Sequence, residues 1–206
     1  MATPHIPQLV EQLGHKSSPK RRAAAKKLRN LKAKEAGPAL LSALRNEVKD
    51  KRTWETQYQM IMALGDSKYT ESLDFLRQLA EQKFDTMIYV ALGDAITRLE
   101  ILSDSHPTSL RKWIDDDKAD LVDGSLRSLA MLRIVPDNEL IKKVIQYVSL
   151  PQNKNIQFWG TAAAPKWPKE LTETFLVKMA KSACLVDTRK AAEAALNGKY
   201  LKWSPL

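Results

Sequence analysis

Few residues of this sequence have the type and spacing that catalysis requires. The three histidines, His5, His15 and His106, fall in expected loops or at helix ends. No H-E-x-x-H, Walker A or G-x-S-x-G sequence occurs. Cys184 is the only cysteine and has no histidine near it in the sequence, so we expect an inert, partly buried thiol. We therefore predict no cofactor and favour a function without catalysis.

Three consecutive aspartates, Asp115, Asp116 and Asp117, suggest a cation site at first sight. Consecutive residues of a helix project about 100° apart, so these carboxylates cannot converge on one ion. We expect the run to end a helix or to lie in a solvated loop, and we predict no metal site.

The positive charge of the chain is concentrated in its first quarter. Residues 1–52 hold 13 Lys/Arg against 4 Asp/Glu, whereas residues 53–206 hold 20 of each, so the formal charge of +9 arises before residue 53. A localised basic surface attracts acidic partners. An acidic protein surface and nucleic acid both fit this pattern.

The segment from Ser17 to Lys32 carries much of this charge in a helical pattern. At about 100° per residue, one face of such a helix is apolar, and it consists of Ala24, Leu28 and Leu31. The opposite face is basic and consists of Arg22, Lys26 and Arg29. We find no packing role for these three residues and predict that they contact a partner, with a merely solvated helix face as the alternative.

The rest of the chain also has a helical pattern. Apolar residues recur at spacings of three and four, and alternating β-branched runs are nearly absent. Pro and Gly separate the apolar segments, as at Gly37-Pro38 and His106-Pro107. No apolar run approaches the roughly 20 residues that span a bilayer. The N-terminal segment lacks the order of a secretory signal, and one cysteine fits a reducing compartment, so we expect a cytoplasmic protein.

A repeat organises these helices. Leucines recur near the ends of alternate helices, at positions 28, 64, 99, 132 and 196, and Ala164 lies at the midpoint of the last, doubled interval. This spacing predicts six helix pairs, at about 4–34, 37–66, 70–102, 106–135, 137–165 and 168–203. Because a pair of this length cannot bury its own apolar stripe, neighbouring pairs must stack. We predict one all-α domain over residues 1–206, an α-α superhelix.

The first and last pairs resemble HEAT repeats of the short, lyase-associated type. The segments that carry the resemblance are "SPKRRAAAKKLRNLKAKEAGPALLSAL" and "DTRKAAEAAL". The resemblance implies a right-handed solenoid whose second helices line a concave surface and whose function is recognition. It also implies that Arg21, beside the apolar face, bridges to the neighbouring unit. The His-Glu pair of the HEAT-repeat hydroxylases is missing, so their iron site is not expected.

The same helical projection assigns faces in the middle repeats. It places Trp54, Tyr58, Ile61 and Leu64 in the core. It places Arg52, Glu55, Gln59, Thr86, Gly93 and Thr97 outside. In the fourth pair, Arg127 lies opposite the apolar face. We predict Arg52, Gln59 and Arg127 as further partner contacts on a basic surface that is strongest at one end of the solenoid.

Two tryptophans are additional candidates for partner contact. Trp113 precedes the aspartate run, and Trp159 lies in "FWGTAAAPKWP", which departs from the repeat pattern. Tryptophan is favoured as an interface anchor. Trp167 ends the same segment. The alternative for this segment is that the fifth pair has a short second helix and that tryptophan fills the gap.

One enzyme class shares features with this chain. The HEAT-like DNA alkylation-repair glycosylases use a basic groove with tryptophans and an aspartate, and Trp113 with Asp117 is a superficial counterpart. However, the basic charge lies in the first two repeats and not along a groove. Our leading hypothesis is therefore a non-enzymatic module that binds an acidic protein through its concave face and its basic N-terminal repeats. The alternative is a nucleic-acid-binding protein, such as a DNA alkylation-repair glycosylase of the HEAT-like type.

Overall fold

The computed structural model describes residues 5–104 and 106–201, and these residues form helices and connecting turns without any strand. The chain divides into two compact units, Met1–Ser105 and His106–Leu206. The first unit contains α1 (Ile6–Gln12), α2 (Ser18–Leu31), α3 (Gly37–Glu47), α4 (Trp54–Asp66), α5 (Leu73–Ala80) and α6 (Thr86–Asp104), with short 3₁₀ helices η1 (Lys34–Ala36), η2 (Lys51–Thr53) and η3 (Thr70–Ser72).

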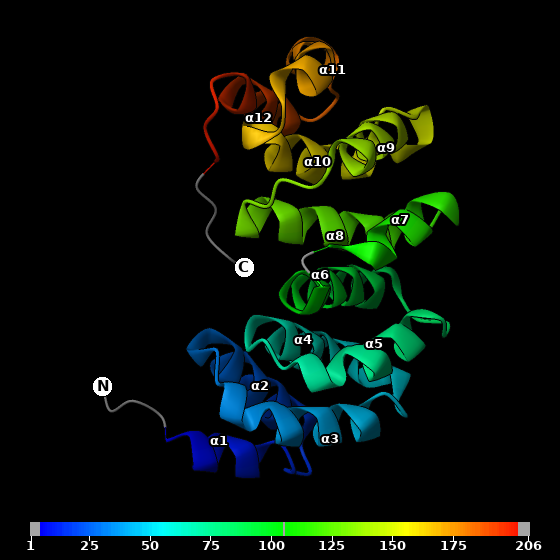
Figure 1. The fold of residues 1–206 in the computed structure, drawn as a ribbon. Coiled ribbons are helices and arrows are strands. Elements are labelled where there is room, and N and C mark those ends of the chain that lie inside the picture. The colour runs from blue at the N-terminus through cyan, green and yellow to red at the C-terminus, as the bar shows by residue number, and fades with distance from the viewer. Residues whose placement is uncertain (1–4, 105, 202–206) are drawn as a thin grey trace. The chain divides into compact units, whose positions relative to one another are not determined.

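The second unit has the same pairwise plan (Figure 1). It contains α7 (Thr108–Asp115), α8 (Ala119–Leu132), α9 (Asn138–Val148), α10 (Gln157–Ala163), α11 (Lys169–Ser182) and α12 (Val186–Leu196), with η4 (Pro151–Ile156) and η5 (Ala164–Lys166). The fold is thus all-α, of the HEAT-like α-α superhelix class, and the six predicted pairs are confirmed.

Several helix boundaries follow from local chemistry. Proline occupies the first turn of α1, α2 and α3, where its missing N–H costs no hydrogen bond. The carboxylate of Asp137 caps α9 by accepting a hydrogen bond from the Leu140 N–H at 3.0 Å. At the ends of α2 and α8, Lys32 and Arg133 adopt left-handed backbone conformations with φ of 50° and 57°. Glycine is the usual residue at such positions.

The second helix of each pair packs against both its own first helix and the second helix of the next pair within the same unit. The layers of second helices are α2–α4–α6 and α8–α10–α12. Leu28, Leu64 and Leu99 are completely buried, as the repeat predicts. Leu132 and Leu196 are instead 40% and 39% exposed, so the repeat register is wrong in these two helices. The neighbouring Leu129 and Ala195 are buried in their place.

More of α6 is buried than the helical projection predicts, because this helix packs against more than one neighbour. Gly93 and Thr97 were expected to face outward, but both are buried. The reason is that α6 packs against α4 as well as α5, so its buried arc is wider than one apolar stripe. Asp94 and Glu100 on this helix are likewise buried.

A close approach of backbones joins α4 to α6. A Cβ atom at Gly65 would lie 2.8 Å from Ala95 Cα, closer than real Cβ atoms come to backbone. Only glycine therefore allows this spacing between the second helices of the second and third pairs.

In the second unit, α8 carries a carboxyl group with a buried oxygen. Oδ1 of Asp123 is buried and has no hydrogen-bond partner in the described part of the chain. Burial, assisted by the nearby Asp120 and opposed by Arg127, raises the pKa of Asp123 to about 7. This carboxyl group is therefore more easily protonated in the folded state than in the unfolded chain.

We expect replacement of Gly65 by alanine to destabilise the first unit by about 1–3 kcal/mol, because the added methyl group overpacks the α4–α6 contact. The loss should appear in urea unfolding curves, although alanine alone would favour the helix by about 1 kcal/mol. The matched control is Gly14→Ala, whose Cβ would lie an ordinary 3.5 Å from Glu11 O. Equal stability of the two variants would contradict the close approach.

The Asp123 carboxyl group should make stability depend on pH. The pKa of Asp123 in the folded state, about 7, exceeds its ordinary value of 3.8. The protonated carboxyl group therefore makes its largest contribution to the free energy of unfolding below about pH 4, and this contribution is lost as the pH rises through about 7. Asp123→Asn cannot ionise, so at pH 8 we expect it to be more stable than the wild type by a few kcal/mol, and at pH 4 by little.

The measurement is denaturant unfolding of both proteins between about pH 4 and pH 8. Asp116→Asn is the control, because this aspartate is exposed at the end of α7. If the difference between Asp123→Asn and the wild type does not change with pH, the buried carboxyl does not titrate as described.

Candidate binding surface

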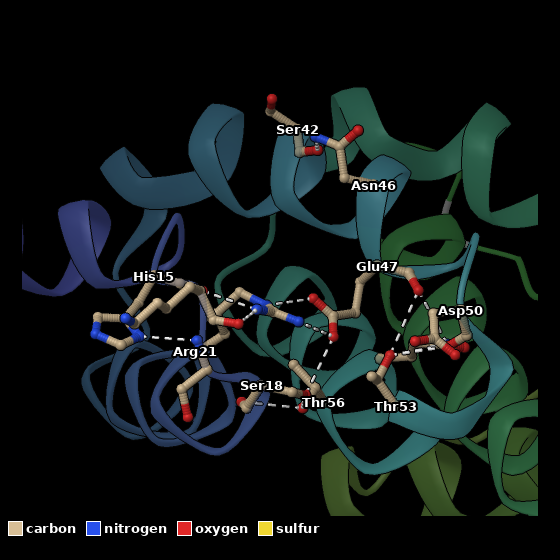
Figure 2. A network of polar contacts seen from close by, with 12 residues as sticks. His15, Ser18, Arg21, Ser42, Asn46, Glu47, Asp50, Thr53 and Thr56 are labelled. Atoms are coloured by element: carbon tan, nitrogen blue, oxygen red, sulfur yellow. Dashed lines mark hydrogen bonds and ion pairs between the residues drawn. The ribbon is translucent and has the colours of Figure 1, made fainter.

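Arg21 on α2 is the centre of a polar network with α3, shown in Figure 2. Its guanidinium donates from Nε to Glu47 Oε2 at 2.6 Å and from Nη2 to Glu47 Oε1 at 2.8 Å. Nη1 donates to the carbonyl oxygens of His15 and Lys16 at 2.7 and 3.0 Å. The hydrogen bonds to Glu47 raise the pKa of Arg21. The predicted structural role of Arg21 as a bridge between repeats is confirmed.

Glu47 also joins α2 to α4. Its side chain is buried and accepts a hydrogen bond from Ser18 Oγ at 3.2 Å, and Ser18 Oγ lies 2.7 Å from Thr56 Oγ1. The bidentate Arg21 pair and this hydroxyl satisfy most of the buried carboxylate's capacity. Arg21 and Glu47 also line a cavity of about 480 Å³ between α1, α2 and α3, whose remaining polar residues include Ser42 and Asn46.

Arg29 was predicted to lie on an exposed face of α2, but it is buried. Its relative exposure is 9%, and its Nε donates to Asp66 Oδ2 at 2.8 Å. Nη1 donates to Gln59 Oε1 at 3.4 Å, so the predicted contact residue Gln59 is engaged by Arg29. The expectation that Arg29 has no packing role is wrong, because the flank of α2 that carries it faces α4.

Asp66 continues this ion pair into the third repeat. Its Oδ1 lies 3.4 Å from Nη1 of Arg98 on α6, and Arg98 also pairs with the buried Asp94. Burial lowers the pKa of Arg98, but attraction to Asp94 and Asp66 and the hydrogen bond that Arg98 donates to Asp94 outweigh this effect, so the pKa is raised. A chain of alternating charges thus connects α2, α4 and α6.

Two further arginines are paired at the surface. Arg22 forms an ion pair with Glu55, and both side chains are partly exposed. Arg52 is almost fully exposed and donates from Nε and Nη2 to Asp50 at 2.9 and 2.8 Å. The hydrogen bonds from the side chain and backbone of Arg52 lower the pKa of Asp50 to about 2. Arg45 lies over the Phe75 ring at 4.3 Å.

All arginines within residues 1–52 are therefore engaged, whereas the lysines in this segment form no ion pair with any other described residue. Lys26 is exposed, as predicted. The basic surface of α2, which we call the lysine face, consists of Lys20, Lys26 and Lys27. Of these three lysines, the helical projection selects only Lys26. The reason is that the projection includes Leu31 in the buried face, whereas Leu31 is 39% exposed.

In the second unit, the structure brings two predicted contacts together. The Arg127 guanidinium on α8 lies 5.9 Å from the centroid of the Trp159 ring on α10. Phe158 packs edge to face with Trp159, with ring centroids 4.8 Å apart. α10 is only seven residues long. The buried Trp167 follows it and donates from Nε1 to Ile134 O at 3.1 Å, so the expected short helix is present and Trp167 fills the gap beside it. Trp159 is half-buried, and its role as a partner contact stays a prediction.

Two other tryptophans are placed differently from prediction. Trp113 is only 3% exposed, because it lies on the apolar side of α7, and it is therefore unavailable as a surface contact or as a stacking platform for a nucleotide. Trp54 was expected in the core but is 38% exposed at the first residue of α4. Sequence reasoning exchanged their roles because the helical projection does not show which turns are covered.

The remaining reactive residues predicted from the sequence are Cys184 and the aspartate run at the end of α7. Cys184 is exposed rather than partly buried. Asp115 pairs with Lys143 at 2.6 Å, and Asp117 accepts a hydrogen bond from Tyr147 at 2.7 Å, so the aspartate run ends α7 as predicted. Among the described residues, no group of His, Cys, Asp and Glu side chains could hold a metal ion. None of the described helices is long and apolar enough to cross a membrane.

Comparison with known proteins gives one match. No curated protein and no solved structure matches the chain. Residues 6–91, which include α1 to α5 and the beginning of α6, match the family model of HEAT repeats. Repeats of this kind often mediate interactions between proteins. The stacked helix pairs and this match together support a HEAT-like repeat architecture.

Proposed function

We propose that this protein is a non-enzymatic binding module that recognises an acidic protein partner through the lysine face of its first repeat. The observation that carries the proposal is the separation of the two kinds of cation. The arginines of residues 1–52 are engaged within the fold, whereas Lys20, Lys26 and Lys27 are exposed and form no ion pair with a described residue.

Unpaired lysines suit an acidic protein surface physically. A lysine ammonium is a compact, mobile charge that attracts carboxylates over a distance without demanding one geometry. Such charges increase the association rate and select against basic partners. Among the predicted contacts, Arg22, Arg52 and Gln59 retain some exposure in the same unit as the lysine face and belong to the proposed surface, whereas Arg29 and Trp113 are buried and do not. Arg127 and Trp159 also retain some exposure, but they lie in the second unit and are a separate candidate contact.

Nucleic acid is the weaker candidate. Arginine recognises phosphate by paired hydrogen bonds, and the arginines of the basic segment are already occupied. Trp113, the proposed counterpart of a glycosylase tryptophan, is buried. The salt dependence of binding distinguishes the two partners, because phosphate contacts release counterions.

The test is binding of a fluorescein-labelled poly-glutamate peptide, followed by fluorescence anisotropy. Replacing Lys20, Lys26 and Lys27 by glutamate should weaken this binding about tenfold or more, because it reverses the attraction at the lysine face. The control replaces Lys142, Lys178 and Lys181 by glutamate. These lysines are exposed on α9 and α11, and both variants have a formal charge of +3 instead of +9.

Two results would contradict the proposal. Equal loss of peptide binding in the two variants would show that net charge, and not the lysine face, attracts the peptide. Retention of a DNA duplex at about 150 mM salt, without peptide binding, would favour the nucleic-acid alternative.

A further inference from the structure

A small apolar pocket lies at the turns of the first unit. Its volume is about 150 Å³, and its lining combines aromatic, aliphatic and charged side chains. Trp54, Phe84 and Ile88 form the apolar part. Lys51, Lys83, Gln57 and Asp85 form the polar part. Trp54 is 38% exposed, whereas Ile88 is only 1% exposed, so an aromatic wall is open to solvent above a buried floor.

The wall that carries Trp54 is held in place by hydrogen bonds. The buried Gln57 side chain donates to the carbonyl oxygens of Glu47 and Asp50 at 3.2 and 2.9 Å. Thr53 Oγ1 donates to Asp50 O at 2.9 Å. These hydrogen bonds fix the turn between α3 and α4, and therefore also the position of Trp54, the first residue of α4.

The wall that carries Phe84 is fixed as well. The Tyr89 hydroxyl donates to Gln82 O at 2.6 Å and accepts from the Phe84 N–H at 3.3 Å. The Phe84 and Tyr89 rings pack edge to face with centroids 6.5 Å apart. Since both walls are ordered before any ligand arrives, a ligand that enters the pocket does not lose affinity to their ordering.

The charges around the pocket indicate the sequence of its occupant. Lys51 comes from the turn before α4 and Lys83 from the turn before α6, so each wall contributes one cation. Both are exposed and form no ion pair with another described residue. Asp85 is the one acidic residue among the seven that line the pocket. An apolar group with acidic residues on both sides would place a carboxylate near each lysine.

The size of the pocket limits the anchor to one side chain. A volume of about 150 Å³ holds a benzene-sized group, which corresponds to the side chain of Phe or Leu. Single-stranded nucleic acid would instead need a platform on which successive bases stack. The pocket therefore favours a peptide over nucleic acid.

We propose that the Trp54–Phe84 pocket binds one aromatic or large aliphatic side chain of an acidic peptide segment, with Lys51 and Lys83 pairing with the acidic residues that flank this anchor. The inference rests on the proposed function, because it names the kind of sequence that the acidic partner presents. It adds a specific anchor to an attraction that is otherwise only electrostatic.

The test compares three fluorescein-labelled peptides by anisotropy: a short Glu/Asp peptide with a central Phe, the same peptide with a central Ser, and a Phe peptide flanked by lysines. The wild-type protein should bind the acidic Phe peptide about tenfold more tightly than the Ser peptide, as expected for one anchor residue. The lysine-flanked peptide should bind weakly or not at all.

Protein variants locate the anchor. Trp54→Ala should abolish the preference for Phe over Ser and leave Ser-peptide binding unchanged. Lys51→Glu combined with Lys83→Glu should weaken both acidic peptides. Leu102→Ala is the matched control, because Leu102 is 47% exposed on α6 and does not line the pocket. In NMR spectra, the indole N–H signal that is absent from Trp54→Phe should shift when the wild type binds the acidic Phe peptide.

The outcomes separate this inference from the proposed function. If neither acidic peptide binds, both are wrong. If the two acidic peptides bind equally and Trp54→Ala has no effect, the pocket is not an anchor site, although recognition of acidic partners stands. If the lysine-flanked Phe peptide binds as tightly as the acidic one, the assigned role of Lys51 and Lys83 is wrong.

Discussion

The carboxylate of Asp66 is shared by two arginines, and the packing of the first unit depends on this arrangement. Arg29 reaches it from α2 and Arg98 from α6, so one side chain of α4 joins the second helices of three repeats. Charges that leave water must be paired, and the loss of one partner leaves the other buried without compensation. The three helices therefore have one register in which Asp66 meets both guanidinium groups. Gly65, the preceding residue, lets α6 approach closely enough.

This internal pairing also decides which charges remain at the surface. The sequence concentrates its net charge before residue 53, but Glu55 and Asp66, which pair with Arg22 and Arg29, come from the next helix pair. Charge counted along the chain therefore differs from charge presented to a partner. Arginine is suited to buried pairs because its planar donors match a carboxylate, whereas lysine is more strongly hydrated and stays in water. Within residues 1–52, the arginines are thus engaged by other residues of the fold, whereas the lysines form no ion pair with another described residue.

The sequence predicts the order of helices well and the environment of single residues less well. The six pairs, the bridging role of Arg21 and the short α10 follow from repeat spacing, resemblance and proline positions. Arg29 was misplaced because a helical projection assumes one buried stripe, whereas a second helix in a stack has two neighbours. Trp54 was misplaced because the projection does not show that the first residue of α4 is left uncovered. Trp113 was selected by its neighbours in the sequence, which do not show that it lies on the buried side of α7. The register error at Leu132 arises because Leu129 and Leu132, one turn apart, are equivalent in spacing and only the packing selects one. At the end of α12, the small Ala195 is buried instead of Leu196. The pocket between Trp54 and Phe84 joins two turns that are distant in sequence, so no local pattern indicates it.

The lysine face and the pocket belong to the same unit and are connected by polar contacts between α2 and α4. The hydroxyl oxygen of Ser18, at the start of α2, lies 2.7 Å from the hydroxyl oxygen of Thr56 on α4. Arg22 of α2 forms an ion pair with Glu55, the residue before Thr56. These contacts fix the first turn of α2 beside the first turn of α4, where Trp54 is located. A ligand held by both surfaces would gain from the second contact without ordering the protein again, because the two surfaces are already oriented. Stacked helix pairs can therefore turn weak, non-directional lysine contacts into recognition of a particular sequence.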